Sequence, residues 1–234
     1  MPKRLDVYLS DNNIVKSRSL AATLIKQGSV EVNGRICTKP SFTVGDGDNV
    51  KIIGELPKYV GRGGLKLEKA LAHYRLHLDG TVCIDIGAST GGFTDCMLQN
   101  GAAKVYSVDV GTDQLDEKLR NDSRVISMEK TDIRNCVGTL PQVDFISIDV
   151  SFISLKLVLP SAFALLKDGG ECVALIKPQF EAGRDKVGKK GVVRDPATHR
   201  EVLHNAMGYA AANSFVVRGL DFSPVKGPEG NIEY

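Results

Sequence analysis

The stretch CIDIGASTGGFTD, residues 83–95, decides the fold of this chain. An apolar run that contains Ile84 and Ile86 breaks at Gly87, and a glycine pair at residues 91–92 precedes a helix-like segment, residues 93–99. Glycine permits positive φ and lets a ligand approach the backbone, while the free N–H groups of a helix start attract an electron-rich group. The stretch therefore predicts a strand, a glycine turn and a helix start that together bind a nucleotide-like ligand.

The spacing within the turn narrows the choice of ligand. Ser89 stands where the dinucleotide fingerprint G-x-G-x-x-G has its second glycine, which disfavours close approach of a pyrophosphate. Asp85 precedes the turn and suits S-adenosylmethionine, whose methionine amine is a cation that needs acidic and carbonyl groups nearby. We therefore expect S-adenosylmethionine to be held at this turn by Asp85, Gly87, Ala88, Ser89, Gly91, Gly92 and Phe93.

From residue 81 onward, strand-like and helix-like segments alternate. The expected strands are residues 82–87, 103–111, 124–133, 143–152 and 171–180, with helical material such as 93–99 and 156–166 between them. This pattern predicts an α/β fold with a Rossmann-like, doubly wound parallel sheet. Such sheets bind ligands at the carboxyl ends of their strands, where we expect Asp109 to bind the ribose hydroxyls, Asp132 with Ile133 to bind adenine, and Asp149 and Lys177 to lie near them.

The first 50 or so residues differ from the rest of the chain in their pattern of predicted helices and strands. They predict two short helices, near residues 5–9 and 17–27, a hairpin at Asn33-Gly34, and further strand in residues 44–53. Residues 1–60 carry nine basic and six acidic side chains, an excess of three in a chain of net charge +2. Pro57 and three nearby glycines suit a linker. We expect a small α+β domain at residues 1–54, a linker at 55–64 and the methyltransferase-like domain at 65–234.

Composition excludes several classes of protein. With 42% hydrophobic and 25% charged residues the chain is ordinary for a globular protein, and its nearly balanced charge confines any nucleic-acid surface to a local patch. No run approaches the roughly 18 apolar residues of a membrane helix, and residues 1–9 lack the apolar centre of a signal peptide, so we expect a cytoplasmic protein that does not bind membranes or DNA. Five cysteines without a C-x-x-C pair, and His73 and His77 without a third ligand, predict no metal site.

The strand ends also bear on the reaction. Enzymes that methylate exocyclic base amines have a proline-containing N/D-P-P-Y/F motif after the fourth strand, but here the sequence is DVSF, residues 149–152. Methylation of a pyrimidine ring carbon needs a cysteine nucleophile near the ligand. Cys172 is expected at the start of its strand, at the end of the sheet away from the expected ligand site. Both reactions are therefore disfavoured, and a hydroxyl remains as the acceptor.

A ribose 2′-hydroxyl must lose its proton as it attacks a methyl carbon. A lysine side chain can accept that proton only if its pKa falls from about 10.4 toward roughly 7 to 8, through desolvation and neighbouring cations. Lys177 follows an apolar strand and precedes the stiff Pro178, which suits this role. Lys66, if its side chain lies near that of Lys177, would lower the pKa of Lys177 by like-charge repulsion. Asp149 with a further acid would orient the two amines.

This arrangement resembles the Lys-Asp-Lys-Glu tetrad of FtsJ-type RNA ribose methyltransferases, and nearly the whole chain resembles the hemolysin A, or TlyA, family of ribosomal RNA 2′-O-methyltransferases. The resemblance rests on RGGLKL, DIGASTGGFTD, SIDVSF, IKPQFE, GVVRDP and SPVKGPEGNIEY. It implies S-adenosylmethionine as methyl donor, ribosomal RNA or ribosomal subunits as partner, and cytidine as the target nucleoside. The catalytic residues that it implies are Lys66, Asp149, Lys177 and Glu233.

The N-terminal segments RLDVYL, SRSLAATLIKQGSVEVNGR and VGDGDNVKI resemble the alpha-L motif, a small RNA-binding domain shared with a ribosomal small-subunit protein. RNA binding through phosphates and shape should be sensitive to salt. The resemblance implies RNA contacts from Arg4, Ser17, Arg18, Lys26, Arg35 and Lys39. We expect further contacts from Arg62 and from residues 184–194, a mobile loop or else a merely solvated one, through Arg184, Lys189, Lys190 and Arg194.

Two other functions remain open at this point. The chain could be a non-catalytic RNA-binding or ribosome-assembly factor that keeps the cofactor fold, and the absence of S-adenosylmethionine binding in calorimetry would favour it. It could also have a hemolysin-like activity, although no amphipathic or membrane-length segment supports pore formation. The sequence leaves the oligomeric state open.

Overall fold

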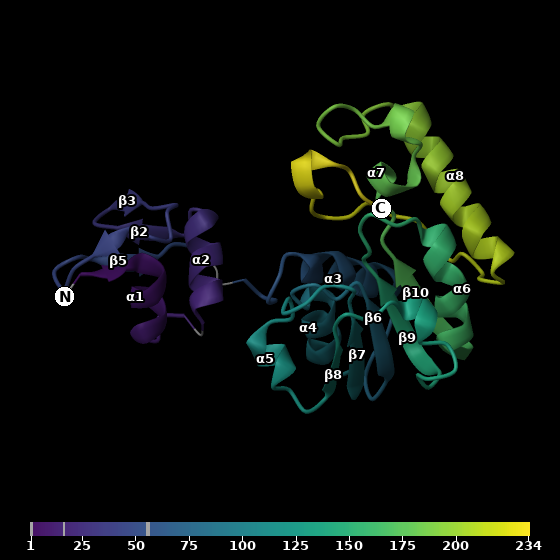
Figure 1. The fold of residues 1–234 in the computed structure, drawn as a ribbon, viewed down its shortest axis with the longest axis horizontal. Coiled ribbons are helices and arrows are strands. Elements are labelled where there is room, and N and C mark those ends of the chain that lie inside the picture. Colours follow the sequence, from purple (N-terminus) through teal and green to yellow (C-terminus); the bar gives the residue numbers. More distant parts are fainter. Residues whose placement is uncertain (1, 16, 55–56) are drawn as a thin grey trace. The chain divides into compact units, whose positions relative to one another are not determined.

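The computed structural model describes residues 2–15, 17–54 and 57–234 and divides the chain into two compact units, residues 1–57 and 58–234 (Figure 1). Residues 55 and 56, the first two of the expected linker, lie outside the described residues. Residues 58–64, also expected as linker, contribute to the second unit, where Tyr59 is buried at 3% exposure.

The first unit is a small α+β domain, as the sequence predicts. Asn33 and Gly34 both have positive φ, at 52° and 81°, and form the tight turn of the predicted hairpin. Leu5, Leu9 and Ile25 from the two helices are fully buried in its core. The elements are β1 (Lys3–Arg4), α1 (Leu5–Asp11), α2 (Arg18–Lys26), β2 (Val30–Val32), β3 (Arg35–Ile36), β4 (Thr43–Val44) and β5 (Val50–Ile52).

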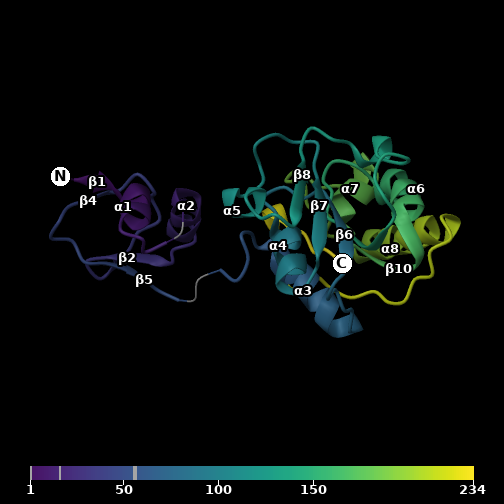
Figure 2. The same ribbon diagram turned by 90° about the horizontal axis from the view of Figure 1, so that it is seen from below.

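A five-stranded parallel sheet forms the centre of the second unit (Figure 2). Its strands run in the order β10 (Leu166–Ala174), β9 (Val143–Ile148), β6 (Val82–Ile86), β7 (Lys104–Val108) and β8 (Val125–Met128). The chain winds outward in one direction from β6 to β8 and in the other from β9 to β10. The predicted doubly wound sheet is therefore confirmed, and its switch point lies between β6 and β9, where such sheets bind their ligands.

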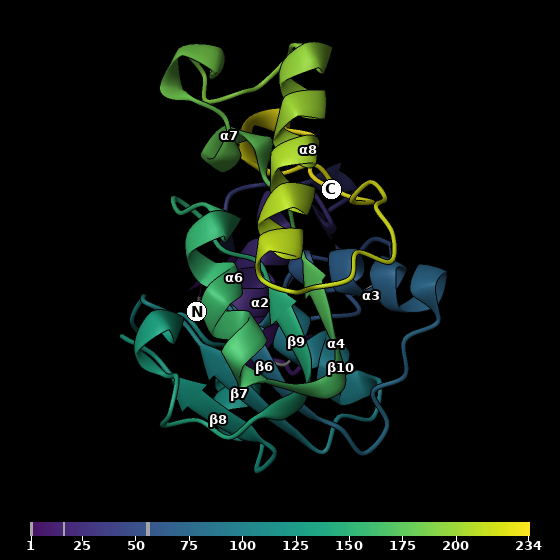
Figure 3. The same cartoon turned by 90° about the vertical axis from the view of Figure 1, so that its right-hand side faces the viewer.

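Helices cover both faces of this sheet (Figure 3). Side chains of β6 alternate between the two faces, as the period of a strand requires. Cys83 packs in the cluster that contains Leu67 of α3 (Gly63–Tyr74) and Met97 of α4 (Gly92–Gln99). Ile84 and Ile86 pack in the cluster formed with α6 (Leu155–Leu165) and α8 (Pro196–Ala212). The shorter helices are α5 (Glu117–Arg120), α7 (Pro178–Glu181), η1 (Ile133–Asn135), η2 (Arg184–Lys186) and η3 (Pro228–Gly230).

The structure differs from the sequence prediction around β10. The strand begins at Leu166, so Cys172 lies inside it and not at its start, and it ends at Ala174. Pro178 begins the helix α7 where strand was expected, because a proline suits the first turn of a helix. The long helix α8 was not predicted, although Asp195 before Pro196 is a typical start signal: its carboxylate accepts hydrogen bonds from the N–H groups of residues 197 and 198.

Within residues 2–15, 17–54 and 57–234, no helix has both the length and the apolar character needed to cross a membrane.

Candidate active site

The glycine turn after β6 is shaped by close backbone contacts. Gly87 has φ of +85°, and a Cβ there would lie 2.5 Å from the carbonyl oxygen of Asp149 at the end of β9. Gly91, at φ of +93°, is the N-cap residue of α4. Because β6 and β9 are neighbours, these glycines bring the turn directly against the residue that follows β9.

The glycines of residues 61–64 pack against the turn and do not serve as a flexible linker. A Cβ on Gly92 would lie 2.9 Å from the backbone nitrogen of Gly64 and 3.3 Å from Cα of Gly63. The start of α3 therefore lies closer to the start of α4 than any larger residue would allow. This contact sets the position of Lys66 in the first turn of α3.

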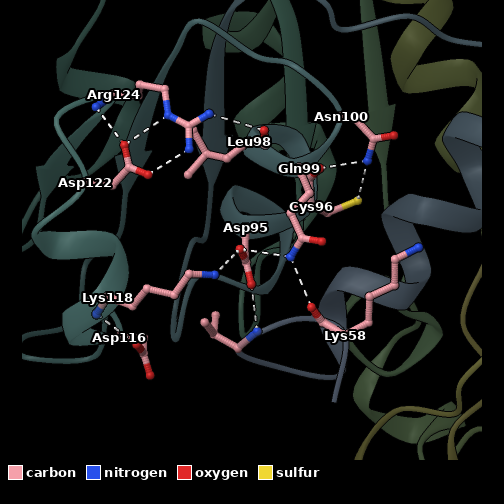
Figure 4. Close-up of polar contacts among 11 residues, drawn as sticks. Lys58, Asp95, Cys96, Leu98, Gln99, Asn100, Asp116, Lys118, Asp122 and Arg124 are labelled. Atoms are coloured by element: carbon pink, nitrogen blue, oxygen red, sulfur yellow. Dashed lines mark hydrogen bonds and ion pairs between the residues drawn. The ribbon is translucent and has the colours of Figure 1, made fainter. Parts of the chain in front are cut away.

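The segment that precedes α3 is fixed to α4 by Asp95 (Figure 4). The Asp95 carboxylate is 2% exposed and accepts hydrogen bonds from the backbone nitrogen of Val60 (3.0 Å), from Lys118 Nζ (2.9 Å) and from Gln99 Nε2 (3.2 Å). Gln99 Nε2 also donates to the carbonyl of Lys58 at 3.0 Å. Residues 58–60 are thus attached to the helix that begins at the glycine turn.

Two lysines and two acids meet beside the turn. Lys177 Nζ lies 2.5 Å from Asp149 Oδ1 and donates to Ser151 Oγ at 3.0 Å. Lys66 Nζ lies 2.5 Å from Glu233 Oε2 and 3.8 Å from Asp149 Oδ2. Asp149 therefore interacts with one lysine through each oxygen, and all four charged side chains are at most 18% exposed.

Glu233 reaches this group through pairing at the end of the sheet. The N–H of Tyr234 donates to the carbonyl of Ile176 at 3.0 Å, and the N–H of Ile176 donates to the carbonyl of Tyr234 at 2.8 Å. The side chain of Glu233 packs against Gly227, where a Cβ would clash with its carboxylate. Its Oε1 is buried and has no hydrogen-bond partner among the described residues.

A pocket of about 330 Å³ joins the glycine turn to these lysines. Of the described residues that line it, none is a cysteine. Sequence analysis missed Ser151 and Lys226, although the segments SIDVSF and SPVKGPEGNIEY contain them. The lining residues are Gly61, Arg62, Gly63, Lys66, Gly87, Ala88, Ser89, Thr90, Gly92, Phe93, Asp149, Ser151, Lys177, Val225, Lys226 and Gly227.

Asp85 does not face this pocket. It is 0% exposed, and its carboxylate accepts hydrogen bonds from Thr94 Oγ1 at 2.7 Å and from Ser147 Oγ at 3.0 Å. Burial raises the pKa of Asp85 to about 6, against the opposing effect of these two hydroxyls. Alternation along β6 turns Asp85 toward α4, beneath the turn, and its expected contact with a ligand amine stays a prediction.

The other expected cofactor residues differ in their surroundings. Asp109, partly exposed after β7, accepts hydrogen bonds from the backbone nitrogens of Ser89 and Gly111, both at 2.7 Å, so it lies beside the turn. Asp132 forms an ion pair with Arg134, which lowers the pKa of that carboxyl. Ile133 is 4% exposed and packs in the core on the α6 side, so its side chain is structural.

The expected RNA-binding residues divide into two groups. The Ser17 side chain caps α2 by accepting from the N–H of Leu20 at 3.2 Å, and Arg4 and Arg18 both bind the buried carboxylate of Asp6, each at 3.0 Å. Hydrogen bonds from Arg4, then Arg18, lower the pKa of Asp6 to about 2. The remaining side chains are exposed: Lys26, Arg35, Lys39, Arg62, Arg184, Lys189, Lys190 and Arg194.

The segment 184–194, expected to be a mobile loop, is held by side-chain contacts. Lys186 forms an ion pair with Glu201 of α8 at 2.6 Å. Asn231, at 2% exposure, donates to the carbonyl of Gly191 at 2.8 Å and accepts from the N–H of Val193 at 3.1 Å. These contacts depend on residues distant in sequence, so the local richness in glycine and lysine did not reveal them.

Comparison with known proteins assigns both units. The model of FtsJ-like methyltransferases matches residues 59–234, and the model of the S4 domain matches residues 3–50. The candidate rRNA methyltransferase YqxC of Bacillus subtilis is 47% identical, over 99% of this chain and 84% of its own. The 16S/23S rRNA (cytidine-2′-O)-methyltransferase TlyA of Mycobacterium tuberculosis is 38% identical, over 99% and 87%.

A solved structure from Streptococcus thermophilus, named as a hemolysin, is also similar. It superposes with a TM-score of 0.77 at 49% sequence identity, and the match covers 99% of this chain and 86% of that one. The similarity extends over both units of the chain, so the relationship is not limited to the sheet that many enzymes share.

Proposed function

This chain belongs to the FtsJ-like methyltransferase family and carries an S4 domain, and from this premise we propose that it methylates a ribose 2′-hydroxyl of ribosomal RNA. S-adenosylmethionine is the methyl donor and cytidine the target, by analogy with the M. tuberculosis relative. In this proposal the unit of residues 1–57 binds RNA and the unit of residues 58–234 carries the reaction. An enzyme that acts on ribosomal RNA would work in the cytoplasm.

The pocket that joins the glycine turn to the lysines carries the proposal. Gly87, Ala88 and Ser89 line one part of it with small side chains, which suits a ligand lying against the backbone. When bound there, S-adenosylmethionine supplies an electrophilic methyl group. Asp109 and Asp132 lie at the ends of neighbouring strands, on the side where the ribose and adenine of the donor would be bound.

Lys177 is the proposed base for the acceptor hydroxyl. As the oxygen would form its bond to the methyl carbon, the bond from that carbon to the donor's sulfur would break, and the proton would pass to the neutral amine of Lys177, which Asp149 and Ser151 hold in one direction. Lys66, between Asp149 and Glu233, orients Asp149 from the other side. Positioned groups of this kind lower the barrier because they need no reorganisation during the reaction.

The first experiment tests this site with Lys177→Ala and Asp149→Ala. Tritiated methyl transfer from S-adenosylmethionine to ribosomal RNA should fall by about 10²–10⁴-fold in each variant, the usual contribution of a positioned base. Alkaline hydrolysis identifies the product, since a 2′-O-methyl group prevents cleavage of the adjacent phosphodiester. Lys167→Ala is the matched control, because Lys167 pairs with Asp144 at the opposite edge of the sheet.

Calorimetry with S-adenosylmethionine accompanies these assays and separates the two remaining functions. Wild type and both variants should bind the donor, because the glycine turn is unchanged. Full activity in both variants would refute the assignment of the base and its partner. Failure of the wild-type protein to bind the donor would instead favour a non-catalytic RNA-binding factor.

A further inference from the structure

A second groove lies on the other side of the C-terminal segment from the catalytic pocket. Its volume is about 560 Å³, and it is formed by the first half of α8 together with two segments, residues 192–196 and 222–234. Lys226 lines both this groove and the catalytic pocket, so the two are adjacent. The lining residues are Val192, Val193, Arg194, Pro196, His199, Arg200, Leu203, Phe222, Lys226, Gly230, Ile232 and Tyr234.

A single extended segment separates the two pockets. Glu233 is 1% exposed and points to Lys66, whereas its neighbours Ile232 and Tyr234 line the groove. Successive side chains of an extended chain point to opposite sides, which accounts for this alternation. A polymeric ligand that occupies the catalytic pocket could therefore place its next unit in the groove.

The groove is positively charged. Arg194, Arg200 and Lys226 line it with exposed side chains, and the lining contains no acidic side chain. Over residues 2–15, 17–54 and 57–234, no carboxylate lies within ion-pair distance of these three cations. The nearby Asp195 caps α8 and also interacts electrostatically with Arg200, whose charge is therefore partly offset. A groove whose only charged lining side chains are cations attracts an anionic ligand.

One wall of the groove is formed by aromatic and other apolar side chains. Phe222 is 60% exposed, and its ring centroid lies 5.3 Å from that of Tyr234 with 40° between the planes. Ile232, at 42% exposure, adds to the same wall. An exposed aromatic ring next to cations is the arrangement that single-stranded nucleic acids use, with the base stacked and the phosphate neutralised.

Buried polar contacts hold the groove in shape. His199 Nε2 lies 3.0 Å from the carbonyl of Val193, and His199 Nδ1 lies 2.9 Å from the Tyr234 hydroxyl. Because a carbonyl can only accept, Nε2 carries the proton, and the tyrosine hydroxyl donates to Nδ1. Asn231 joins the two segments through its bonds to Gly191 and Val193. The aromatic wall is therefore fixed before any ligand binds.

We propose that this groove binds the nucleotide adjacent to the methylated one in the same RNA strand. Its base stacks on Phe222, and Lys226 binds the phosphate that joins the two nucleotides, since Lys226 borders both pockets. Arg194 and Arg200 bind the phosphate on the far side. The inference rests on the proposed function and adds a second recognised nucleotide to its substrate.

Two variants test the groove, Phe222→Ala and Arg200→Gln. With ribosomal RNA as acceptor, the KM for RNA should rise about tenfold in each, as expected for the loss of one stacking or phosphate contact. The kcat should stay within about twofold, and the Kd for S-adenosylmethionine should not change. Phe163→Ala and Arg218→Gln are matched controls, because these side chains are exposed and lie outside both pockets.

A binding measurement tests the groove without methyl transfer. Fluorescein-labelled hexacytidylate is titrated into the full-length proteins and followed by anisotropy, and its Kd should rise about tenfold in each groove variant. Arg200→Gln changes an exposed side chain, so it remains informative if Phe222→Ala does not fold. Wild-type affinity in the variants, or no binding to wild type, overturns the groove. Absence of methyl transfer by the wild type, with hexacytidylate binding intact, overturns the proposed function instead.

Discussion

Asp85 shows how a single buried carboxylate affects the stability of the second unit. Its pKa is raised from 3.8 to about 6, first because burial penalises the charged form, while Thr94 and Ser147 oppose the shift. Between these two values the folded state holds the proton more tightly than the unfolded state. Stability therefore falls as the pH rises through this range, by about 3 kcal/mol in total between about pH 3 and pH 7 for a shift of this size.

Replacement Asp85→Asn should remove this pH dependence. The amide cannot ionise, so the free energy of unfolding of this variant should fall by about 2 kcal/mol less than that of wild type between pH 4 and pH 6. Urea unfolding at pH 4, 5, 6 and 7 measures the difference. Asp113→Asn is the control, because the Asp113 side chain is 81% exposed and should keep the wild-type slope. Equal slopes for wild type and Asp85→Asn would contradict the raised pKa.

At the scale of elements, the contact between α3 and α4 positions Lys66. The two helices begin at glycines that lie almost in van der Waals contact, and the segment before α3 is attached to α4 by Asp95. Because Asp95 is buried, its removal would leave the Val60 N–H without its acceptor, whereas the Lys118 side chain, at 54% exposure, remains in contact with water. This junction therefore fixes Lys66, in the first turn of α3, beside the glycine turn.

Replacement Asp95→Ala should lower the stability of the second unit. Loss of the acceptor for the Val60 N–H and for Lys118 should cost about 1–3 kcal/mol, which corresponds to a fall in Tm of about 3–10 °C. Asp122→Ala is the matched control shown in the same view (Figure 4), since it removes three hydrogen bonds to Arg124 on the surface. Differential scanning calorimetry should find the smaller change for Asp122→Ala. An equal change in both would show that burial does not matter here.

At the scale of the whole molecule, we propose that the S4 unit binds RNA and that the second unit carries out methyl transfer. The S4 unit carries exposed basic side chains, and the second unit carries the lysine pocket. Phosphate contacts release counterions, so the logarithm of the RNA-binding constant should fall linearly with the logarithm of salt concentration, with a slope set by the number of contacts. The contribution of each unit can therefore be measured from the salt dependence of binding by the intact chain.

The double variant Arg35→Gln with Lys39→Gln should reduce this slope. If both side chains contact phosphates, the magnitude of the slope should fall by about 1.4–1.8. Filter binding to ribosomal RNA between low and moderate salt measures it, and binding of S-adenosylmethionine should not change. The control is Lys104→Gln. Lys104 is the first residue of β7, at the amino end of the strand, whereas the pocket lies at the carboxyl ends. An unchanged slope would place the RNA on another surface.

Sequence alone determined the parts that depend on local geometry. Glycine at positive φ, the alternation of apolar residues and the hairpin at Asn33-Gly34 predicted the sheet, the turn and the first domain. The rule that ligands bind at carboxyl ends singled out Asp149 and Lys177, and the structure places them 2.5 Å apart. The same local signals did not predict α8, although Asp195 before Pro196 is a typical helix start.

Only the tertiary structure decided which distant residues meet. Lys66 and Glu233 are 167 positions apart and form an ion pair because residue 234 pairs with residue 176 beside β10. Gly61, Gly63 and Gly64 pack against the start of α4, and Asp85 lies beneath the glycine turn. Both placements depend on which face of a helix or strand is covered by the rest of the domain. Local propensity specifies φ and ψ, but the covering of a face depends on the packing of the whole domain.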